Sequence, residues 1–381
     1  MNKLLIKNIS LITKDTILEK HSLLVEDGKI ARIAPTEQLS HISDASVVQA
    51  EGEYLAPGLI DLHIHGFAGH GPEQATPEAL LEMSAALAKH GVTAFCPTLY
   101  AEQPQELAVK LKKLVPSFGK EKGAKIIGFH LEGPFISPYK LGVMKPQDIA
   151  APDVKILEKL YEAADGHIAA VTLAPELKNT QPIIDFCLKH HILPQAGHTN
   201  ATYEEFLYAI KTGVKHVTHL FNAMSPFHHR APGVAGGALM HPEVSCEVIA
   251  DGVHVHPHLV SFLRTVKPLD KIVLVTDSLL PTGLEDGPFV ANGEGVIFEA
   301  GAWHRTFDHV LAGSALTMAQ GVRNLVAWGY SLPQAIQCAA ANPAQLMNWP
   351  AGKLTEGAPA DLILLDKNLN VLHTFINGQE K

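Results

Sequence analysis

Hydrophobic and polar residues follow two different periods along this chain of 381 residues. Near the N-terminus, the runs LLIKNISLIT and SLLVEDGKIARIA have the two-residue period of β-strands, and Asp27–Gly28 within the second run is typical of a hairpin turn. The C-terminal stretch ADLILLDKNLNVLHTFINGQEK has the same character, with two apolar runs around the polar DKNLN. We therefore predict that 1–56 and 350–381 pair into one small β-sandwich domain, which would also hold both chain ends in place.

Between these ends, short apolar runs alternate with amphipathic stretches of helical period. In one such stretch, 76–91, Thr76 is a suitable helix N-cap and Gly91 a suitable stop. Another, NATYEEFLYAIKTG, has Asn200 as its expected cap. The apolar runs that predict strands are 58–65, 92–99, 124–132, 168–175, 192–199, 216–222, 245–254 and 271–278. Eight strand–helix units fit a (β/α)8 barrel of about 250 residues, so we predict the α/β class with a TIM-like barrel over 57–349. The glycine-rich stretch 283–313 after the eighth run predicts a hairpin or lid.

Side chains that can bind a metal stand at the ends of five of the eight predicted strands. The first strand carries His63 and His65, which strand alternation places on one face together with Asp61. The other such residues are Glu132, His198, His219 and Asp277, from the third, fifth, sixth and eighth strands. The C-terminal ends of barrel strands surround one active-site face. Four imidazoles and two carboxylates there suit Zn²⁺ or Fe²⁺, with an open position for water.

Each of these residues has an ordinary structural explanation when it is taken alone. A histidine at a strand end is more often a hydrogen-bonded core or rim residue than a ligand. Glu132 and Asp277 could each cap a helix. These explanations do not account for HIH, HLEGP, AGHT, THLFN and VTDS all standing at the ends of apolar runs in one strand–helix series. The joint placement therefore predicts a shared metal site.

Charge and composition limit the kinds of partner that this chain can bind. The 30 Lys and Arg against 39 Asp and Glu give a net charge of −9, and no basic run stands out. We therefore expect neither nucleic acid nor an anionic membrane as a partner. The 4 cysteines are scattered without a CxxC pair, which is typical of reduced thiols. Because no apolar stretch is long enough for a signal peptide or a membrane span, we expect a cytoplasmic protein.

The motifs HIHG, LEGPF, AGHTNATYEE, THLFNAM, ADGVHV, VTDS and LAGSALTM follow one another in this order. Together they resemble the N-acetylglucosamine-6-phosphate deacetylases of the amidohydrolase superfamily. The similarity runs nearly end to end, through GKLTEGAPADLILLD. THLFNAM and LEGPF are specific to that family, whereas HxH marks only the superfamily. The resemblance implies an enzyme that hydrolyses the acetamide of N-acetyl-D-glucosamine 6-phosphate in amino-sugar catabolism, using one or two divalent metal ions, zinc or iron.

The resemblance also implies roles for single residues. The ligands of the principal metal would be Glu132, His198 and His219. His63 and His65 would belong to a second metal site that only some family members have, and Asp277 would be the general acid and base. The contacts to the sugar phosphate would come from Asn222, the backbone N–H of Ala223, His254 and Arg230. Arg230 would reach the phosphate bound by a neighbouring subunit, which implies a homodimer.

General chemistry agrees with these roles. Amide hydrolysis at neutral pH needs a strong nucleophile, and a metal ion lowers the pKa of a water that it binds to about 7. Asp277 would take the proton of that water and deliver it to the departing amine. A phosphate far from the scissile bond can supply binding energy for orientation, and an arginine is its natural bidentate partner. Without the family context, a solvated loop charge is the better explanation of Arg230, and the roles of the adjacent His228 and His229 stay open.

One position departs from the family pattern. After LEGPF the family usually has a Gly-x-His whose histidine polarises the acetamide carbonyl, but this chain has KLGVMK, with Met144 at that place. Because methionine cannot donate a hydrogen bond, a second metal or another histidine would take this role, or the substrate differs. The acidic residue that follows the family's arginine is also replaced, in HHRAPG.

Two other functions are compatible with parts of this pattern. The same barrel and metal would serve a deacetylase of N-acetylgalactosamine 6-phosphate or of another phosphorylated N-acyl sugar. A barrel that binds a ligand without catalysis is disfavoured, because every expected metal ligand and Asp277 are present.

Overall fold

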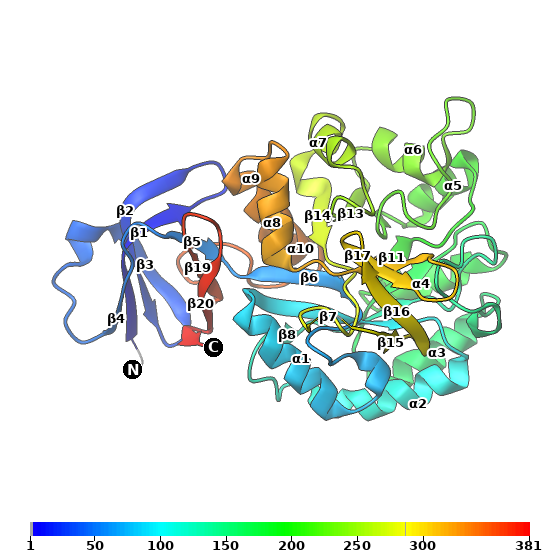
Figure 1. Cartoon of the computed structure of the whole chain (residues 1–381), viewed down its shortest axis with the longest axis horizontal. Coiled ribbons are helices and arrows are strands. Elements are labelled where there is room, and N and C mark those ends of the chain that lie inside the picture. Colours follow the sequence, from blue (N-terminus) through cyan, green and yellow to red (C-terminus); the bar gives the residue numbers. More distant parts are fainter. Residues whose placement is uncertain (1–2, 286) are drawn as a thin grey trace.

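Two bodies make up the computed structural model, a barrel and a smaller domain of β-strands that carries both chain ends (Figure 1). The structure describes residues 3–285 and 287–381. Met1 and Asn2, in the predicted N-terminal β unit, and Asp286, in the predicted insertion, lie outside the described residues. Within the described ranges, no helix is long and apolar enough to cross a membrane.

The predicted barrel is a parallel sheet in the strand order β14-β13-β12-β11-β10-β9-β7-β6, with the short β8 also paired to β7. Its strands are β6 Leu59–Ile64, β7 Val92–Tyr100, β8 Lys125–Ile126, β9 Phe129–Glu132, β10 Ile168–Leu173, β11 Leu193–Ala196, β12 His216–Val217, β13 Ser245–Ile249 and β14 Ile272–Val275. The ring closes where the N–H of Asp277 donates to the carbonyl of His63 at 2.9 Å and the N–H of His65 to the carbonyl of Ser278 at 3.0 Å. The predicted fold class is confirmed.

Helices follow the strands and cover the outside of the ring (Figure 1). They are α1 Pro77–Lys89, α2 Pro104–Leu114, α3 Val154–Ala163, α4 Thr180–Lys189, α5 Tyr203–Thr212, α6 Gly233–Met240, α7 Pro257–Val266 and α8 Met318–Ala327, followed by the short α9 Leu332–Ile336 and α10 Asn342–Leu346. Thr76 caps α1 as predicted, by accepting the N–H of Ala79. The prediction of Asn200 as the cap of α5 is wrong, because Thr202 forms a capping box with Glu205. Apolar side chains at helical spacing, such as Leu80, Met83 and Leu87, pack into the core between helices and strands.

Strands from both ends of the chain form one sheet in the order β21-β20-β19-β5-β1-β2-β3, with β4 paired to β1. They are β1 Lys3–Ile12, β2 Ile17–Glu26, β3 Lys29–Pro35, β4 Ser46–Gln49, β5 Tyr54–Pro57, β19 Leu362–Leu365, β20 Val371–Ile376 and β21 Gln379–Glu380. Asp27 and Gly28 have φ values of 48° and 77°, as the predicted hairpin turn requires. The N–H of Ile30 donates to the carbonyl of Ala358 at 2.9 Å, which folds the sheet around one apolar core. The limits 1–56, 57–349 and 350–381 of the two domains stay a prediction.

The predicted insertion holds an antiparallel sheet of four strands. They are β15 Phe289–Ala291, β16 Glu294–Glu299, β17 Ala302–Arg305 and β18 Leu311–Ser314. The sheet is joined to the end of β14, because the N–H of Ser314 donates to the carbonyl of Asp277 at 2.9 Å. This bond places the insertion beside the end of the eighth barrel strand.

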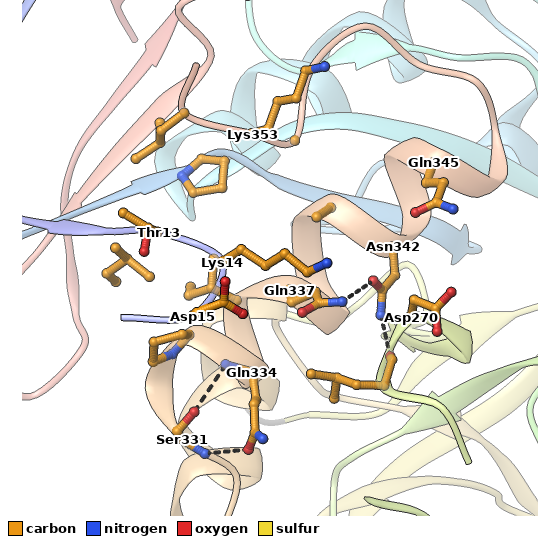
Figure 2. A pocket seen from close by; sticks show the side chains of 18 of the residues that line it. Thr13, Lys14, Asp15, Asp270, Ser331, Gln334, Gln337, Asn342, Gln345 and Lys353 are labelled. Atoms are coloured by element: carbon orange, nitrogen blue, oxygen red, sulfur yellow. Dashed lines mark hydrogen bonds between the residues drawn. The ribbon is translucent and has the colours of Figure 1, made fainter. Parts of the chain in front are cut away.

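A hollow of about 840 Å³ lies where the terminal domain meets the barrel (Figure 2). Lys14 and Asp15 line it from one side, and Asp270 and Asn342 from the other. The amide of Asn342 donates to the carbonyl of Ile272 at 2.7 Å, at the first residue of β14. The hollow is therefore at the opposite end of the barrel from the predicted metal ligands, so its size does not make it the candidate site.

Candidate metal centre

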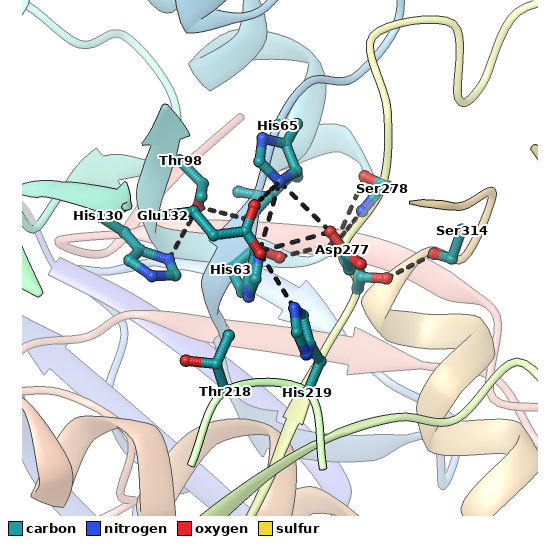
Figure 3. A network of polar contacts seen from close by, with 12 residues as sticks. His63, His65, Thr98, His130, Glu132, Thr218, His219, Asp277, Ser278 and Ser314 are labelled. Atoms are coloured by element: carbon teal, nitrogen blue, oxygen red, sulfur yellow. Dashed lines mark hydrogen bonds and ion pairs between the residues drawn. The ribbon is translucent and has the colours of Figure 1, made fainter. Parts of the chain in front are cut away.

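The structure brings the six predicted metal-site residues together at the C-terminal end of the barrel strands, and Figure 3 labels all of them except His198. Glu132 lies at the centre: its Oε1 is 3.0 Å from His219 Nε2 and 3.1 Å from His198 Nε2. Its Oε2 is 3.2 Å from His65 Nε2. Asp277 Oδ1 lies 3.4 Å from both His63 Nε2 and His65 Nε2. The donor atoms form two adjacent groups in which all atoms lie within 4.8 Å, namely Glu132 with His198 and His219, and His63 with His65 and Asp277.

Most of these residues lie just beyond the strands, where the sequence predicted longer strands. His198, His219 and Asp277 each stand two residues after the last residue of β11, β12 and β14. Their φ values of 46°, 28° and 52° are left-handed, so the β conformation ends before them. Such a conformation costs a side-chain-bearing residue about 1–3 kcal/mol, so neighbouring contacts must hold it. The turn at each strand end aims the side chain at the shared point.

Strand alternation is also broken in β6. The pairing of β6 with β7 has a register irregularity between Asp61 and Ile64. The carboxylate of Asp61 does not join the cluster with His63; it accepts the hydroxyl of Thr276 at 2.6 Å and its N–H at 3.2 Å. The prediction that Asp61 shares a face with the two histidines is therefore wrong. Burial raises the pKa of Asp61 to about 7.

In two of the imidazoles, a hydrogen bond to Nδ1 determines that Nε2 is the nitrogen that faces the cluster. His198 Nδ1 lies 2.8 Å from the carbonyl oxygen of Lys140, and His63 Nδ1 lies 3.0 Å from Glu247 Oε2. Because carbonyl and carboxylate oxygens only accept, each Nδ1 carries a proton, and Nε2 is the nitrogen whose lone pair can face a bound cation. Converging lone pairs on nitrogen and carboxylate oxygen suit a divalent cation, so this donor set fits a metal site.

The charges of the cluster also favour a bound cation. Burial raises the pKa of Glu132, but His63 and His198 outweigh it and hold that pKa well below its usual value. Burial lowers the pKa of His63, but the carboxylates around it, with Asp277 foremost, raise that pKa well above its usual value. The cluster therefore favours added positive charge. A divalent cation supplies that charge in place of protons.

The sequence analysis missed Glu247, which is completely buried in β13. Its Oε2 accepts from His63 Nδ1 and from the backbone N–H of His219, each at 3.0 Å. Its Oε1 lies 3.4 Å from His216 Nε2. The signal was present in the sequence, because Glu247 is the one charged residue in the strand SCEVI. A charge in a buried strand needs partners nearby.

A cavity of about 200 Å³ opens above the cluster. The predicted substrate residues Asn222, Ala223 and His254 line it. His254 Nδ1 lies 2.6 Å from Asp251 Oδ2, which leaves Nε2 as the free nitrogen of this ring. The structure does not bring Arg230 to the cavity of the same chain; its exposed guanidinium contacts His229 Nε2 at 2.8 Å.

Met144 lines the same cavity and has an apolar role in the fold. Its buried side chain belongs to a cluster with Tyr100, Leu279, Ala291 and Trp303. Ala291 and Trp303 are in the inserted sheet, so Met144 helps to hold that sheet against the barrel end.

Comparison with known proteins places these features in a family. The model of the amidohydrolase family matches residues 54–381. The N-acetylglucosamine-6-phosphate deacetylase of Bacillus subtilis is 34% identical over 98% of this chain and 96% of its own length. The N-acetylgalactosamine-6-phosphate deacetylase of Escherichia coli O157:H7 is 31% identical over 97% of each chain.

Solved structures agree along the whole chain. The N-acetylglucosamine-6-phosphate deacetylase of Pasteurella multocida superposes with a TM-score of 0.93 and 30% identity, covering 100% of this chain and 99% of that one. An aspartate-to-alanine mutant of the Mycobacterium smegmatis enzyme, in complex with N-acetyl-D-glucosamine-6-phosphate, gives a TM-score of 0.92 and 28% identity over 100% and 99% of the two chains.

We predict that Glu132→Ala loses bound metal and activity together, because the carboxylate of Glu132 contacts imidazoles of both donor groups. Elemental analysis of the purified variant measures the metal. Glu158→Ala, on the exposed side of α3, is the control and should keep both properties. A Glu132→Ala protein with a full metal complement would contradict this ligand assignment.

Proposed function

Because this chain belongs to the amidohydrolase family, and within it to the N-acetylglucosamine-6-phosphate deacetylases, we propose that it hydrolyses the acetamide of N-acetyl-D-glucosamine 6-phosphate. The products are D-glucosamine 6-phosphate and acetate. The observation that carries this proposal is the cluster of four imidazoles and two carboxylates beneath a cavity, in a chain with relatives of this activity over nearly its full length.

The metal would be held mainly by Glu132, His198 and His219, with a second ion held by His63 and His65. Zinc and iron(II) both suit nitrogen and carboxylate donors. A divalent ion bound there would supply Lewis acidity towards the amide carbonyl and towards water. Asp277 lies 3.4 Å from two of the imidazoles, which places its carboxylate beside this point. It would accept a proton from the attacking water and then donate it to the departing amine.

The sugar phosphate would be held in the cavity by the amide of Asn222, the backbone N–H of Ala223 and the ring of His254. Asp251 accepts from two backbone N–H groups in its own turn as well as from the ring, so it keeps that imidazole in a single orientation. A held ring and a backbone donor lose little freedom on binding, which favours precise placement of the substrate.

Arg230 would complete the phosphate site of a neighbouring copy in a homodimer. Its guanidinium lies outside the cavity of its own chain, on an exposed loop. Phe227 on the same loop is 60% exposed, and three neighbouring helices each expose a large apolar side chain. These are Tyr208 of α5, Met240 of α6 and Phe262 of α7. Exposed apolar side chains on adjoining elements are typical of a subunit interface.

N-acetylgalactosamine 6-phosphate is the second candidate substrate. It is favoured by the E. coli relative, which covers nearly the whole of both chains at an identity close to that of the glucosamine enzymes. The two sugars differ only in the configuration of one hydroxyl group. The scaffold and the proposed metal site serve either.

Acetate release from the two epimers tests the function directly. We expect the metal-loaded protein to release acetate fastest from N-acetyl-D-glucosamine 6-phosphate, and Glu132→Ala to release none. Faster release from the galactosamine epimer would select the second candidate. No release from either substrate by a protein with bound metal would contradict the proposed activity.

We predict that Arg230→Ala lowers kcat/KM on the phosphorylated sugar by about 30- to 1,000-fold, the effect of losing a charge-assisted contact of about 2–4 kcal/mol. Turnover of the unphosphorylated sugar and metal content should not change. Lys189→Ala, which removes one positive charge at the exposed end of α4, is the matched control. If both substrates suffer equally, the arginine holds the loop or the dimer instead.

We predict that the protein binds more than one zinc ion per chain when it is loaded with excess Zn²⁺, because His63 and His65 converge with Asp277. His63→Asn should reduce the stoichiometry to one. Elemental analysis after removal of free metal measures both proteins. If the unmodified protein and the variant each bind one zinc ion per chain, the protein has a single metal site and the prediction is wrong.

A further inference from the structure

Two donor groups that come from different strands share one buried carboxylate. We propose that Glu247 is the positioning residue that makes the second metal site, by holding the ring of His63 and the backbone of His219 with the same oxygen atom. This inference rests on the two metal sites of the proposed function. It adds a residue that contacts neither of the two proposed ions.

Glu247 holds the ring of His63. Glu247 Oε2 accepts from His63 Nδ1 at 3.0 Å, so Nε2 is the nitrogen left to face the cluster. That Nε2 lies 3.4 Å from Glu132 Oε1 and from Asp277 Oδ1. The side chains of His63 and Glu247 are 0% and 1% exposed, so this contact is shielded from solvent. Without the carboxylate, neither the tautomer nor the ring orientation of His63 would be set.

Glu247 also holds the backbone of His219. Its φ of 28° is strained for a side-chain-bearing residue, and its N–H donates to the same Oε2 at 3.0 Å. One residue later, the N–H of Leu220 donates to the backbone carbonyl of Glu247 at 2.9 Å. Glu247 thus supports the turn that aims His219 at Glu132. A ligand of each donor group therefore depends on this one residue.

The position of β13 explains why this residue can reach both. In the ring, β13 lies between β12, which precedes His219, and β14, which is next to β6. A side chain that points inward from β13 can therefore bridge the sixth and the first strand positions. His216 Nε2 faces the other oxygen at 3.4 Å, and its Nδ1 is held by Ser245 Oγ at 2.7 Å. The carboxylate is thereby held from both sides.

Glu247→Gln tests the inference, because it keeps the shape of the side chain and removes its charge. The amide oxygen of glutamine can still accept from the N–H of His219, whereas the lost charge weakens the hold on the ring of His63. We therefore expect the affinity for the second zinc ion to fall about 10-fold, and the affinity for the first ion to fall less. Equilibrium dialysis against graded Zn²⁺ with elemental analysis measures both affinities without any substrate. The double variant His63→Asn, Glu247→Gln should bind one ion, as His63→Asn alone is expected to do, because the two residues act as one unit.

Asp361→Asn is the matched control, since Asp361 is a buried carboxylate of the terminal domain that accepts from Lys125 and from the N–H of Asn377, each at 2.8 Å. It should lower the melting temperature and leave both zinc affinities unchanged. The inference is overturned if Glu247→Gln binds two ions as tightly as the unmodified protein, or if it loses both ions equally. A single ion in the unmodified protein also overturns it, whereas two ions without acetate release contradict only the proposed activity.

Discussion

Three carboxylates placed among imidazoles at the mouth of the barrel are the constraint on which the site depends. Glu132 and Glu247 are buried, and the side chain of Asp277 is 13% exposed. An ionised carboxylate without a partner is very costly away from water. Each of the three therefore lies within hydrogen-bond or ion-pair distance of a histidine. Hydrogen bonds already occupy Nδ1 of His63 and Nδ1 of His198. The positive charge that the carboxylates still need is therefore best placed at the point that the Nε2 atoms share.

This arrangement exists because the barrel closes between its first and eighth strands. The backbone bonds from Asp277 to His63 and from His65 to Ser278 bring residues more than 200 positions apart into one ring. The left-handed turns after β11, β12 and β14 then direct one side chain from each strand end towards Glu132. Strained turns of this kind are tolerated because neighbouring hydrogen bonds hold them.

The inserted sheet gives the cavity its apolar wall. Met144 packs with Trp303, and the indole N–H of Trp303 donates to the hydroxyl of Thr282 at 3.1 Å. The N–H of Ser314 is bonded to the carbonyl of Asp277, so the insertion is attached directly to the backbone of the proposed acid–base residue. The methionine that interrupts the family's Gly-x-His pattern is thus part of the contact between insertion and barrel.

The sequence by itself determined the fold class and the strand ends at which the donor residues stand. Its periods of 2 and 3.6 are local properties, and they were sufficient to predict eight strand–helix units and a terminal sheet built from both chain ends. The motifs around His63, Glu132, His198, His219 and Asp277 marked residue types that share metal chemistry. The hairpin at Asp27–Gly28 and the cap at Thr76 were equally local, and the structure has both.

Only the tertiary structure decided which of these groups meet and what holds them. The strands end before His198, His219 and Asp277 because hydrogen bonds from other strands stabilise a left-handed backbone that no local period encodes. The irregular pairing of β6 turned Asp61 to Thr276 and away from His63. Glu247 could be recognised as an unusual charge in a buried strand, but its partners lie 28 and 184 residues away. Contacts across such separations depend on the closure of the whole barrel, and for this reason the sequence pattern alone could not supply them.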